Sequence, residues 1–472
     1  MSENQFDSAN NDDRVGQKRL CHRCIGETFL KEEAKRLNQV STCSYCSSQG
    51  EAIAISEFAK LVEVALDHHY QRVSDQSPQE VERNWDNEGE LIAEVIADTA
   101  KIDKQAAEDT RSFLANRECL EACAEPFDSE PFEADVHYIE TEPNDAVFHN
   151  QWVSFEHILK EEARFFSRKT FAFLDSIFAD LLNHKTSSGQ SVIIDAGPAK
   201  IISELYRARV FQSDNKLIEA LTHPDVEIGP PPSRIVKSGR MNPLGISVFY
   251  GSRDIDTAIA EVRPPVGSRT VTASFKIIRP IRLLDVNALR LIKKQGSIFD
   301  PTYLNQLQQA NFLRTLSDLI SRPVMPDDEL FEYITTQAIA SYLDTEIGLD
   351  GIIYPSAQTG KGSSNIVLFH RAAFVEPIII SEKLRLHANL YDYDEDGRTE
   401  EYTVVETILN NPPEPSSLME SPIEEPTLKV NLESLTVHRV FSSEFSKGSL
   451  PVNRVQITER KHDPNKPDQD LF

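Results

Sequence analysis

The chain has 472 residues, 40% of them hydrophobic and 26% charged, which is typical of a soluble globular protein with two or three domains. Asp and Glu number 75 against 49 Lys and Arg, and the net charge of −26 excludes general nucleic-acid binding because the surface would repel phosphate. No apolar run approaches the roughly 18 residues of a membrane span, and the polar N-terminus differs from a signal peptide. We therefore expect a cytoplasmic protein that makes no membrane contact.

The first part of the chain is predicted to be mainly helical. Residues 1–17 are polar and are predicted to be disordered, and a helical domain is predicted over 18–183. The helical pattern is carried by ISEFAKLVEVALDHHY, GELIAEVIADTAKI and FEHILKEEARFFSRKTFAFLDSIFADLL. The apolar stripe of the first segment consists of Phe58, Leu61, Val62, Ala65 and Leu66, and that of the last consists of Phe155, Leu159, Phe166, Phe173, Ile177 and Leu181.

The pattern changes at the Gly/Ser turn that begins at residue 183. Short β-rich runs follow, namely SVIID, SELYRARVF, ISVFYG, RTVTASFKII, IRLLDV, DGIIYPSA and NIVLFH. Helical patterns at DIDTAIAEV and ELFEYITTQAIASYLDTEI lie between them, so a mixed α/β domain is predicted over 184–385 and an α+β class for the whole chain. The acidic, Pro-rich segment 386–427 is predicted to be a linker or loop, and 428–472 to hold strands and a polar tail.

Four of the six cysteines form two Cys-x-x-Cys pairs, Cys21 with Cys24 and Cys43 with Cys46. Their spacing is typical of four-cysteine zinc sites, and a redox role would need a βαβ context that is missing here. Four thiolates close the coordination shell, so the predicted zinc is structural rather than catalytic. The remaining pair, Cys119 and Cys123, is four residues apart and is predicted to be two buried thiols on one helical face.

Three stretches of the second domain concentrate residues that suit the chemistry of an active site. They are ELYRARV, GRMNPLGISVFYGSRDIDTAIAEVRP and DGIIYPSAQTGKGSSNIVLF. Taken singly, each candidate has an ordinary structural explanation as a surface charge, a core-rim aromatic, a solvated carboxylate or a turn residue. Together they fall at strand ends and loops, which indicates a site built from Arg207, Arg240, Asn242, Tyr250, Glu261, Ser356 and Asn365.

These stretches resemble the RES domain family, named for its Arg, Glu and Ser, over about residues 185–385. The two cysteine pairs ahead of a helical segment resemble the HEPN-like N-terminal domain found before some RES domains, over about 15–180. Arg207, Glu261 and Ser356 match the three family residues, and Tyr250 matches the family's aromatic position. Met241 stands where the family often has Trp after the arginine, which affects the local packing rather than the chemistry.

The resemblance implies an ADP-ribosyltransferase-like fold and consumption of NAD, as in toxin members of the family. A carboxylate beside the ribose stabilises an oxocarbenium-like transition state when nicotinamide leaves, and this role is assigned to Glu261. Arg207 and Arg240 are expected to bind the pyrophosphate through their planar guanidinium groups. Tyr250 is expected to stack on the nicotinamide and Ser356 to contact the substrate near the cleaved bond, with Asn242 and Asn365 as further substrate-binding residues.

The resemblance therefore predicts a toxin or defence effector that splits NAD, with water, phosphate or a protein side chain as the acceptor. Two alternatives remain open, an ADP-ribosyltransferase that modifies a protein and a non-catalytic module that senses nucleotide. The helical half lacks the Arg-x4–6-His pair of HEPN nucleases, so regulation, dimerisation or sensing is expected of it. By analogy with RES toxins, a neutralising protein partner is also expected.

Overall fold

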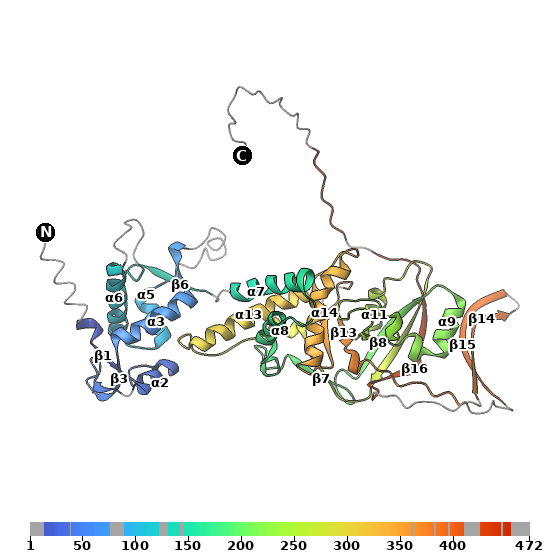
Figure 1. The fold of residues 1–472 in the computed structure, drawn as a ribbon, viewed down its shortest axis with the longest axis horizontal. Helices are drawn as coiled ribbons and strands as arrows, with labels where there is room; N and C mark the ends of the chain where they lie inside the picture. The colour runs from blue at the N-terminus through green and yellow to red at the C-terminus, as the bar shows by residue number, and fades with distance from the viewer. Residues whose placement is uncertain are drawn as a thin grey trace, which may run out of the picture.

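The computed structural model describes residues 14–37, 39–75, 89–121, 131–141, 145–359, 362–381, 384–394, 397–409, 425–444 and 447–454. The described part is elongated, with a small N-terminal unit at one end and a larger unit built on a sheet at the other (Figure 1). Among the described residues, no helix has both the length and the apolar character needed to span a membrane.

The N-terminal unit combines helices with two small antiparallel sheets. Its helices are α2 (Thr28–Arg36), α3 (Ile55–His69), α5 (Ile92–Ala100) and α6 (Lys104–Glu121). One sheet has the order β1-β3-β2, from Arg19–Cys21, Gln49–Ala54 and Val40–Thr42, and the other has the order β4-β6-β5, from Tyr70–Arg72, His137–Glu140 and Glu90–Leu91. A short 3-10 turn (Val73–Asp75) follows β4. Phe58 and Val62 of α3 are buried with Ile92 and Ile96 of α5, which confirms the amphipathic pattern of both segments.

The segment that carries the predicted apolar stripe from Phe155 to Leu181 is not one continuous helix. It forms α7 (Ala146–His157), a π-helical turn (Ile158–Glu162) and α8 (Arg168–Phe178). Ser167 begins α8 as its N-cap, because its hydroxyl accepts a hydrogen bond from the backbone N–H of Thr170. Phe166 just before it has a left-handed φ of 59° and a fully exposed side chain, so the prediction that Phe166 belongs to the buried stripe is wrong.

The larger unit is organised around an eight-stranded sheet of order β16-β10-β8-β9-β13-β12-β11-β7. Its strands are β7 (Ile193–Ala196), β8 (Glu204–Phe211), β9 (Phe249–Ser252), β10 (Arg269–Ile277), β11 (Ile281–Asp285), β12 (Gly351–Pro355), β13 (Ser364–Leu368) and β16 (Leu428–Arg439). Neighbouring strands are antiparallel except β11 and β12. The C-terminal strand β16 thus extends the sheet at the edge beside β10.

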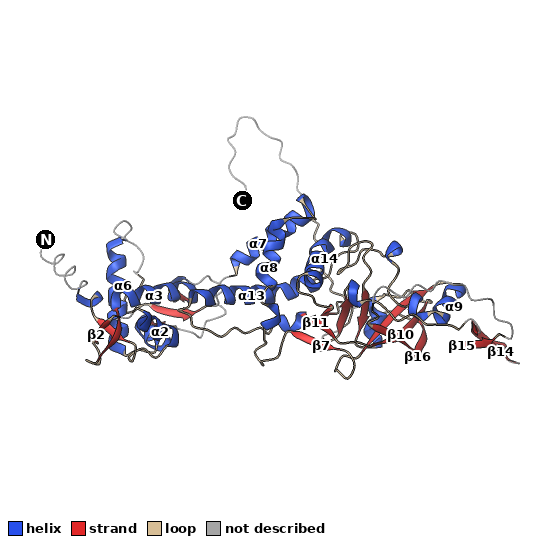
Figure 2. Ribbon diagram, turned by 60° about the horizontal axis from the view of Figure 1, so that its bottom comes forward, coloured by secondary structure: helices blue, strands red, loops and turns tan. Residues whose placement is uncertain are grey.

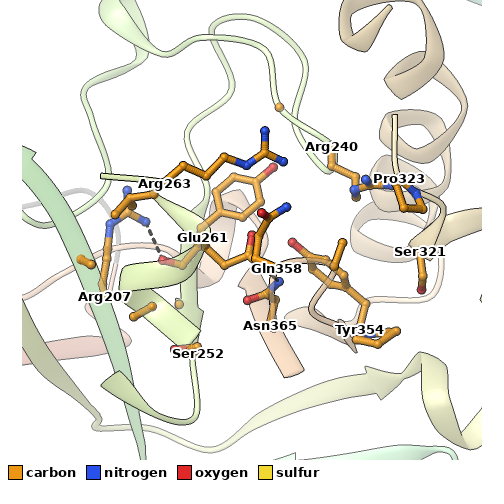
Figure 3. Close-up of a pocket in the computed structure, with 18 of the residues that line it drawn as sticks. Arg207, Arg240, Ser252, Glu261, Arg263, Ser321, Pro323, Tyr354, Gln358 and Asn365 are labelled. Carbon is orange, nitrogen blue, oxygen red and sulfur yellow. Dashed lines mark hydrogen bonds between the residues drawn. The ribbon is translucent and has the colours of Figure 1, made fainter. Parts of the chain in front are cut away.

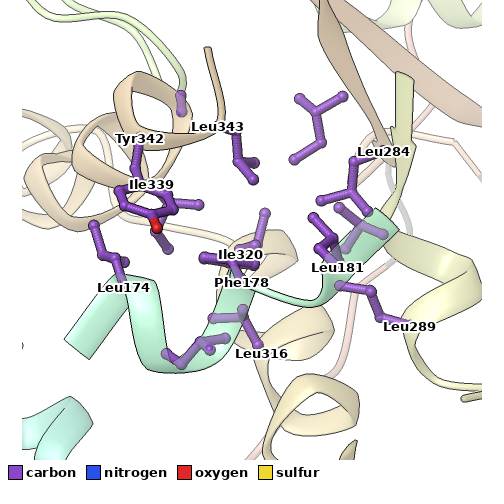
Figure 4. Close-up of a cluster of buried hydrophobic side chains, with 14 of the residues drawn as sticks. Leu174, Phe178, Leu181, Leu284, Leu289, Leu316, Ile320, Ile339, Tyr342 and Leu343 are labelled. Atoms are coloured by element: carbon purple, nitrogen blue, oxygen red, sulfur yellow. The ribbon is translucent and has the colours of Figure 1, made fainter. Parts of the chain in front are cut away.

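Both faces of the sheet are buried, which explains why its strands read as nearly continuous apolar runs. Ile352 belongs to the core under α7, α8, α13 (Pro301–Ser321) and α14 (Glu329–Thr345), whereas its neighbour Ile353 belongs to the core of the opposite face. Figure 4 shows part of the first core, where Phe178 of α8 meets Leu316 and Ile320 of α13. The second core is covered by α9 (Asp214–Thr222) and α10 (Pro224–Glu227). Shorter helices lie at Leu181–Asn183, Ser233–Ile235, Ile255–Glu261 (α11), Val286–Leu289 (α12) and His370–Ala372.

Helix α13 joins the two units. Figure 2 shows it running from the N-terminal unit toward the sheet. Phe299, just before its start, is buried in the core of the N-terminal unit, and Tyr303 in its first turn stacks on His69 of α3 at 6.5 Å. Its last turn packs with α8 and α14. Because α7 and α8 bury side chains in the core under the sheet, we propose that the larger unit begins near residue 145, ahead of the predicted boundary at 183.

The predicted linker contains a hairpin of β14 (Leu384–Asp394) and β15 (Gly397–Ile408). Its first strand alternates apolar and polar side chains, and Ala388 and Leu390 are buried in the second core. The prediction of a linker or loop is therefore wrong for these residues. Their acidic composition obscured the alternation of apolar and polar residues that is typical of a strand. The start of the chain also differs, since Val15 packs against the N-terminal core, whereas residues 1–13 of the predicted disordered segment lie outside the described residues.

Candidate active site

The predicted site residues converge at the middle of the large sheet. Strands β8, β9, β13 and β12 are consecutive there and carry Arg207, Tyr250 and Asn365, while Ser356 follows the end of β12. Helix α11 ends at Glu261 and contacts β8, β9, β10 and β13. These elements line a cavity of about 430 Å³, within the usual range of ligand sites (Figure 3).

The carboxylate of Glu261 is held from one side. Its Oε1 accepts hydrogen bonds from Ser356 Oγ at 2.6 Å and from Asn365 Nδ2 at 2.7 Å. The same Ser356 oxygen accepts from the backbone N–H groups of Gln358 and Thr359 at 3.2 and 3.3 Å, so its own proton is directed at Glu261. The other oxygen, Oε2, has no hydrogen-bond partner among the described residues. Glu261 therefore presents one oriented oxygen for a ligand.

Arg207 stands in the wall formed by β8. It donates a hydrogen bond to the backbone oxygen of Tyr250 at 2.9 Å, and its guanidinium lies 5.1 Å from the centre of the Phe249 ring. Burial, assisted by the charge of Arg209, lowers the pKa of Arg207 to about 10. At neutral pH the group is still a cation, and it faces the cavity together with Glu261.

Tyr250 is fixed by its hydroxyl group. The hydroxyl donates to Asn242 Oδ1 at 2.9 Å and accepts from the backbone N–H of Met241 at 3.0 Å. Burial raises the pKa of Tyr250, so the phenol stays protonated. With the hydroxyl fixed, the ring lines the cavity in a fixed orientation.

Asn242 does not line the cavity, contrary to its predicted role in substrate binding. Its side chain is 3% exposed, and its Nδ2 lies within hydrogen-bonding distance of the carbonyl oxygens of Lys237, Pro243 and Ile246. The amide thus holds the loop that precedes β9. Met241 beside it is buried in the core under α13 and α14, where its apolar side chain packs.

Arg240 occupies the opposite wall from Arg207 (Figure 3). It donates to the carbonyl oxygens of Ile320 and Arg322 at 2.8 and 3.0 Å, at the end of α13. Its guanidinium also lies 4.9 Å from the centre of the Tyr333 ring on α14. The position of Arg240 therefore depends on the two helices that cover this face of the sheet.

Several cavity residues were not predicted from the sequence, among them Arg263, Tyr333, Tyr354 and Gln358. Arg263 follows Glu261 by two residues, and Tyr333 comes from a helix far along the chain. The lining contains three arginines against the carboxylates of Glu261 and Glu329. A chain with a net charge of −26 thus carries a locally basic cavity, which suits an anionic ligand.

The four predicted zinc ligands meet at the far end of the molecule, around β1, β2 and β3 (Figure 1). The sulfur atoms of Cys21, Cys24, Cys43 and Cys46 all lie within 4.8 Å of one another, and three of the separations are 3.6, 3.6 and 3.9 Å. In a tetrahedral site with Zn–S bonds of about 2.3 Å, neighbouring sulfurs are about 3.8 Å apart, so the quartet fits zinc. Cys119 lies in α6 with its side chain outside the described part of the structure, and Cys123 lies outside the described residues.

Comparisons with known proteins agree with this arrangement. The family model described as RES domain matches residues 204–389, and the model described as HEPN/RES N-terminal domain 1 matches residues 37–171. No curated protein matches the chain. A chain of the M. tuberculosis MbcT–MbcA toxin–antitoxin complex is similar over 36% of this chain and 74% of its own, with 13% identity and a TM-score of 0.20. On the two family matches, the chain carries a RES domain over residues 204–389 and a HEPN/RES N-terminal domain ahead of it, over residues 37–171.

Proposed function

We propose that this protein is an NAD-consuming enzyme that cleaves the bond between nicotinamide and ribose, and that it acts as a toxin or defence effector. One observation carries the proposal most directly. Glu261 stands on the wall of a basic cavity with one carboxylate oxygen held by Ser356 and Asn365, and its other oxygen has no hydrogen-bond partner in the part of the chain that the structure describes. The match to the RES domain supports the same reaction class.

The chemistry of the bond explains why such a carboxylate is useful. When neutral nicotinamide leaves from its cationic ring, positive charge develops on the ribose, and a fixed anion beside the sugar stabilises that charge. Oε2 of Glu261 is the oxygen we assign to this role. The hydroxyl of Ser356 donates to Glu261, which supports a positioning role for Ser356 rather than the direct substrate contact predicted from the sequence.

The remaining walls suit the rest of the dinucleotide. Tyr250 offers a fixed ring on which the nicotinamide can stack, and Arg207 and Arg240 keep guanidinium donors beyond those bonded to carbonyl oxygens. We assign these two arginines to the pyrophosphate side of the site. The fold is expected to resemble ADP-ribosyltransferases, and the ADP-ribosyl group passes to water, phosphate or a protein side chain.

The test is nicotinamide release from NAD by the full-length protein, beside Glu261→Gln and Glu346→Gln. The amide oxygen of a glutamine at position 261 still accepts from Ser356 and Asn365, so this variant removes the charge and keeps the hydrogen-bond geometry. We expect it to lower kcat by about 100- to 1,000-fold, the usual effect of losing one preorganised electrostatic contact. Glu346 is exposed at the end of α14, and its variant is expected to match the wild type.

The products separate the alternatives. Free ADP-ribose indicates hydrolysis, a phosphorylated ADP-ribose indicates phosphate as the acceptor, and a mass increase on a lysate protein indicates transfer. Tight nucleotide binding with no nicotinamide released by the wild type would refute the enzyme and support the sensing module.

We also propose that the cysteine quartet binds a structural zinc ion. The sulfur separations and the burial of Cys21 and Cys43 support this assignment. Four thiolates leave no open coordination position, so the ion would stabilise the β1-β3-β2 sheet and take no part in NAD cleavage.

A further inference from the structure

We propose that Arg263 recognises the phosphate groups of the dinucleotide and makes the cavity selective for NAD over nicotinamide ribosides that lack phosphate. This inference rests on the proposed function and deepens it. Arg263 is not one of the three residues, Arg207, Glu261 and Ser356, that match the family motif.

The end of α11 places a cation beside the carboxylate. The helix ends at Glu261, Val262 is its C-cap, and the backbone N–H of Arg263 donates to the carbonyl oxygen of Ala260 at 3.1 Å. This tight turn separates the two functional side chains by one residue. Figure 3 shows the side chain of Arg263 extending over the cavity from the side of Glu261. In NAD the ribose bound to nicotinamide is followed directly by a phosphate, so neighbouring anionic and cationic groups match neighbouring parts of the ligand.

The backbone of Arg263 adopts a conformation that disfavours any side chain. Its φ is 43°, in the left-handed region, at the position after a helix C-cap where glycine is the usual residue. A side chain there costs about 1 kcal/mol relative to glycine. Among the described residues, the guanidinium has no hydrogen-bond or ion-pair partner that would offset this cost. A strained residue aimed into a cavity without a structural partner indicates a ligand contact.

Each of the other two cavity arginines uses some of its donors in hydrogen bonds to the protein backbone. Arg207 bonds to the carbonyl oxygen of Tyr250, and Arg240 bonds to those of Ile320 and Arg322. Each also lies over an aromatic ring. Within the described part of the cavity lining, Arg263 is the arginine whose guanidinium donors are all available. It can therefore offer the two parallel N–H groups that bidentate binding of a phosphate uses. The exposed position of Arg263 at the cavity mouth also places its charge where an incoming anion arrives first.

The test combines binding with turnover in the full-length protein. ADP-ribose affinity is measured by calorimetry, and nicotinamide release is measured with NAD and with nicotinamide riboside. Arg263→Gly suits the backbone, so the midpoint of thermal unfolding should hold or rise, and a failure to fold is not a concern. Arg263→Lys keeps the charge but loses the planar fork. Arg253→Met, which removes an exposed arginine outside the cavity lining, is the matched control.

We expect Arg263→Gly to weaken ADP-ribose binding at least tenfold and to raise KM for NAD with little change in kcat. Turnover of nicotinamide riboside should stay at the wild-type level, Arg263→Lys should fall between, and Arg253→Met should match the wild type. Wild-type ADP-ribose affinity in Arg263→Gly, or no ADP-ribose binding by the wild type, would overturn the inference. If the wild type binds ADP-ribose through Arg263 but releases no nicotinamide, the proposed reaction fails and the role of Arg263 stands.

Discussion

Ser356 provides the sharpest test of how the site works, because its hydroxyl points at Glu261 rather than into open space. Replacing it with alanine removes the 2.6 Å hydrogen bond to Oε1 and leaves the Asn365 amide as the remaining donor to that oxygen among the described residues. A hydrogen bond to a charged group contributes about 1.5–3 kcal/mol. At about 1.4 kcal/mol per tenfold change in rate, Ser356→Ala should lower kcat by about 10- to 150-fold.

The assay is the initial rate of nicotinamide release over a range of NAD concentrations. A residue that acts through Glu261 should change kcat and leave KM nearly constant, because it orients the catalytic group without binding the substrate. Ser213→Ala is the matched control, since Ser213 accepts a backbone N–H at the start of α9 and is exposed, with α9 on the opposite face of the sheet. It should lose about 1 kcal/mol of stability and no activity. A raised KM with an unchanged kcat in Ser356→Ala would show that Ser356 contacts the substrate and refute the positioning argument.

Two further predictions concern the architecture. The purified protein should contain one zinc ion per chain by elemental analysis. Cys21→Ser should remove the bound zinc and lower the unfolding temperature of the N-terminal unit. A wild-type protein that is free of metal and as stable as the zinc-bound form would contradict the zinc assignment. A variant that begins at residue 145 should retain a cooperative unfolding transition, whereas one that begins at residue 184 should not. The reason is that α7 and α8 bury six large apolar side chains in the core under the sheet, at about 1.5–3 kcal/mol each (Trp152, Phe155, Phe173, Leu174, Ile177 and Phe178). Their sum is comparable to the whole stability of a domain, about 5–15 kcal/mol, so equal unfolding temperatures of the two variants would refute the boundary.

The strands of the large sheet can be predicted from the sequence because they are buried on both faces. Continuous apolar runs such as those of β10 and β12 stand out without any need to assign a face. Helix α13 was missed although Asp300 caps it and Pro301 begins it. Its buried residues fall in the second half, from Ala310 to Ile320, and the first half is polar where it crosses between the units, so the helical period is visible over only part of its length.

The sequence predicts which residues form the site, but it does not predict several of the contacts that these residues make. Neighbouring strands of the sheet, β8, β9 and β13, bring Arg207, Tyr250 and Asn365 together, which local motifs suggest. The direction of the Ser356 proton depends on two backbone N–H groups in the following turn, and the inward orientation of Asn242 depends on three carbonyl groups of its loop. Neither leaves a periodic signal. Arg263 was missed for a similar reason, since a single positive φ is a property of the folded turn and not of the residue type.

The two ends of α13 give the molecule a mechanical connection. A helix of 21 residues is about 31 Å long and bends little over that length. One end is anchored by Phe299 and Tyr303 in the unit that carries the cysteine quartet, and the carbonyl oxygens at the other end hold Arg240. Because both ends of the helix are anchored, a displacement of the N-terminal unit along the helix axis would move the carbonyl groups that hold Arg240 in the distant cavity.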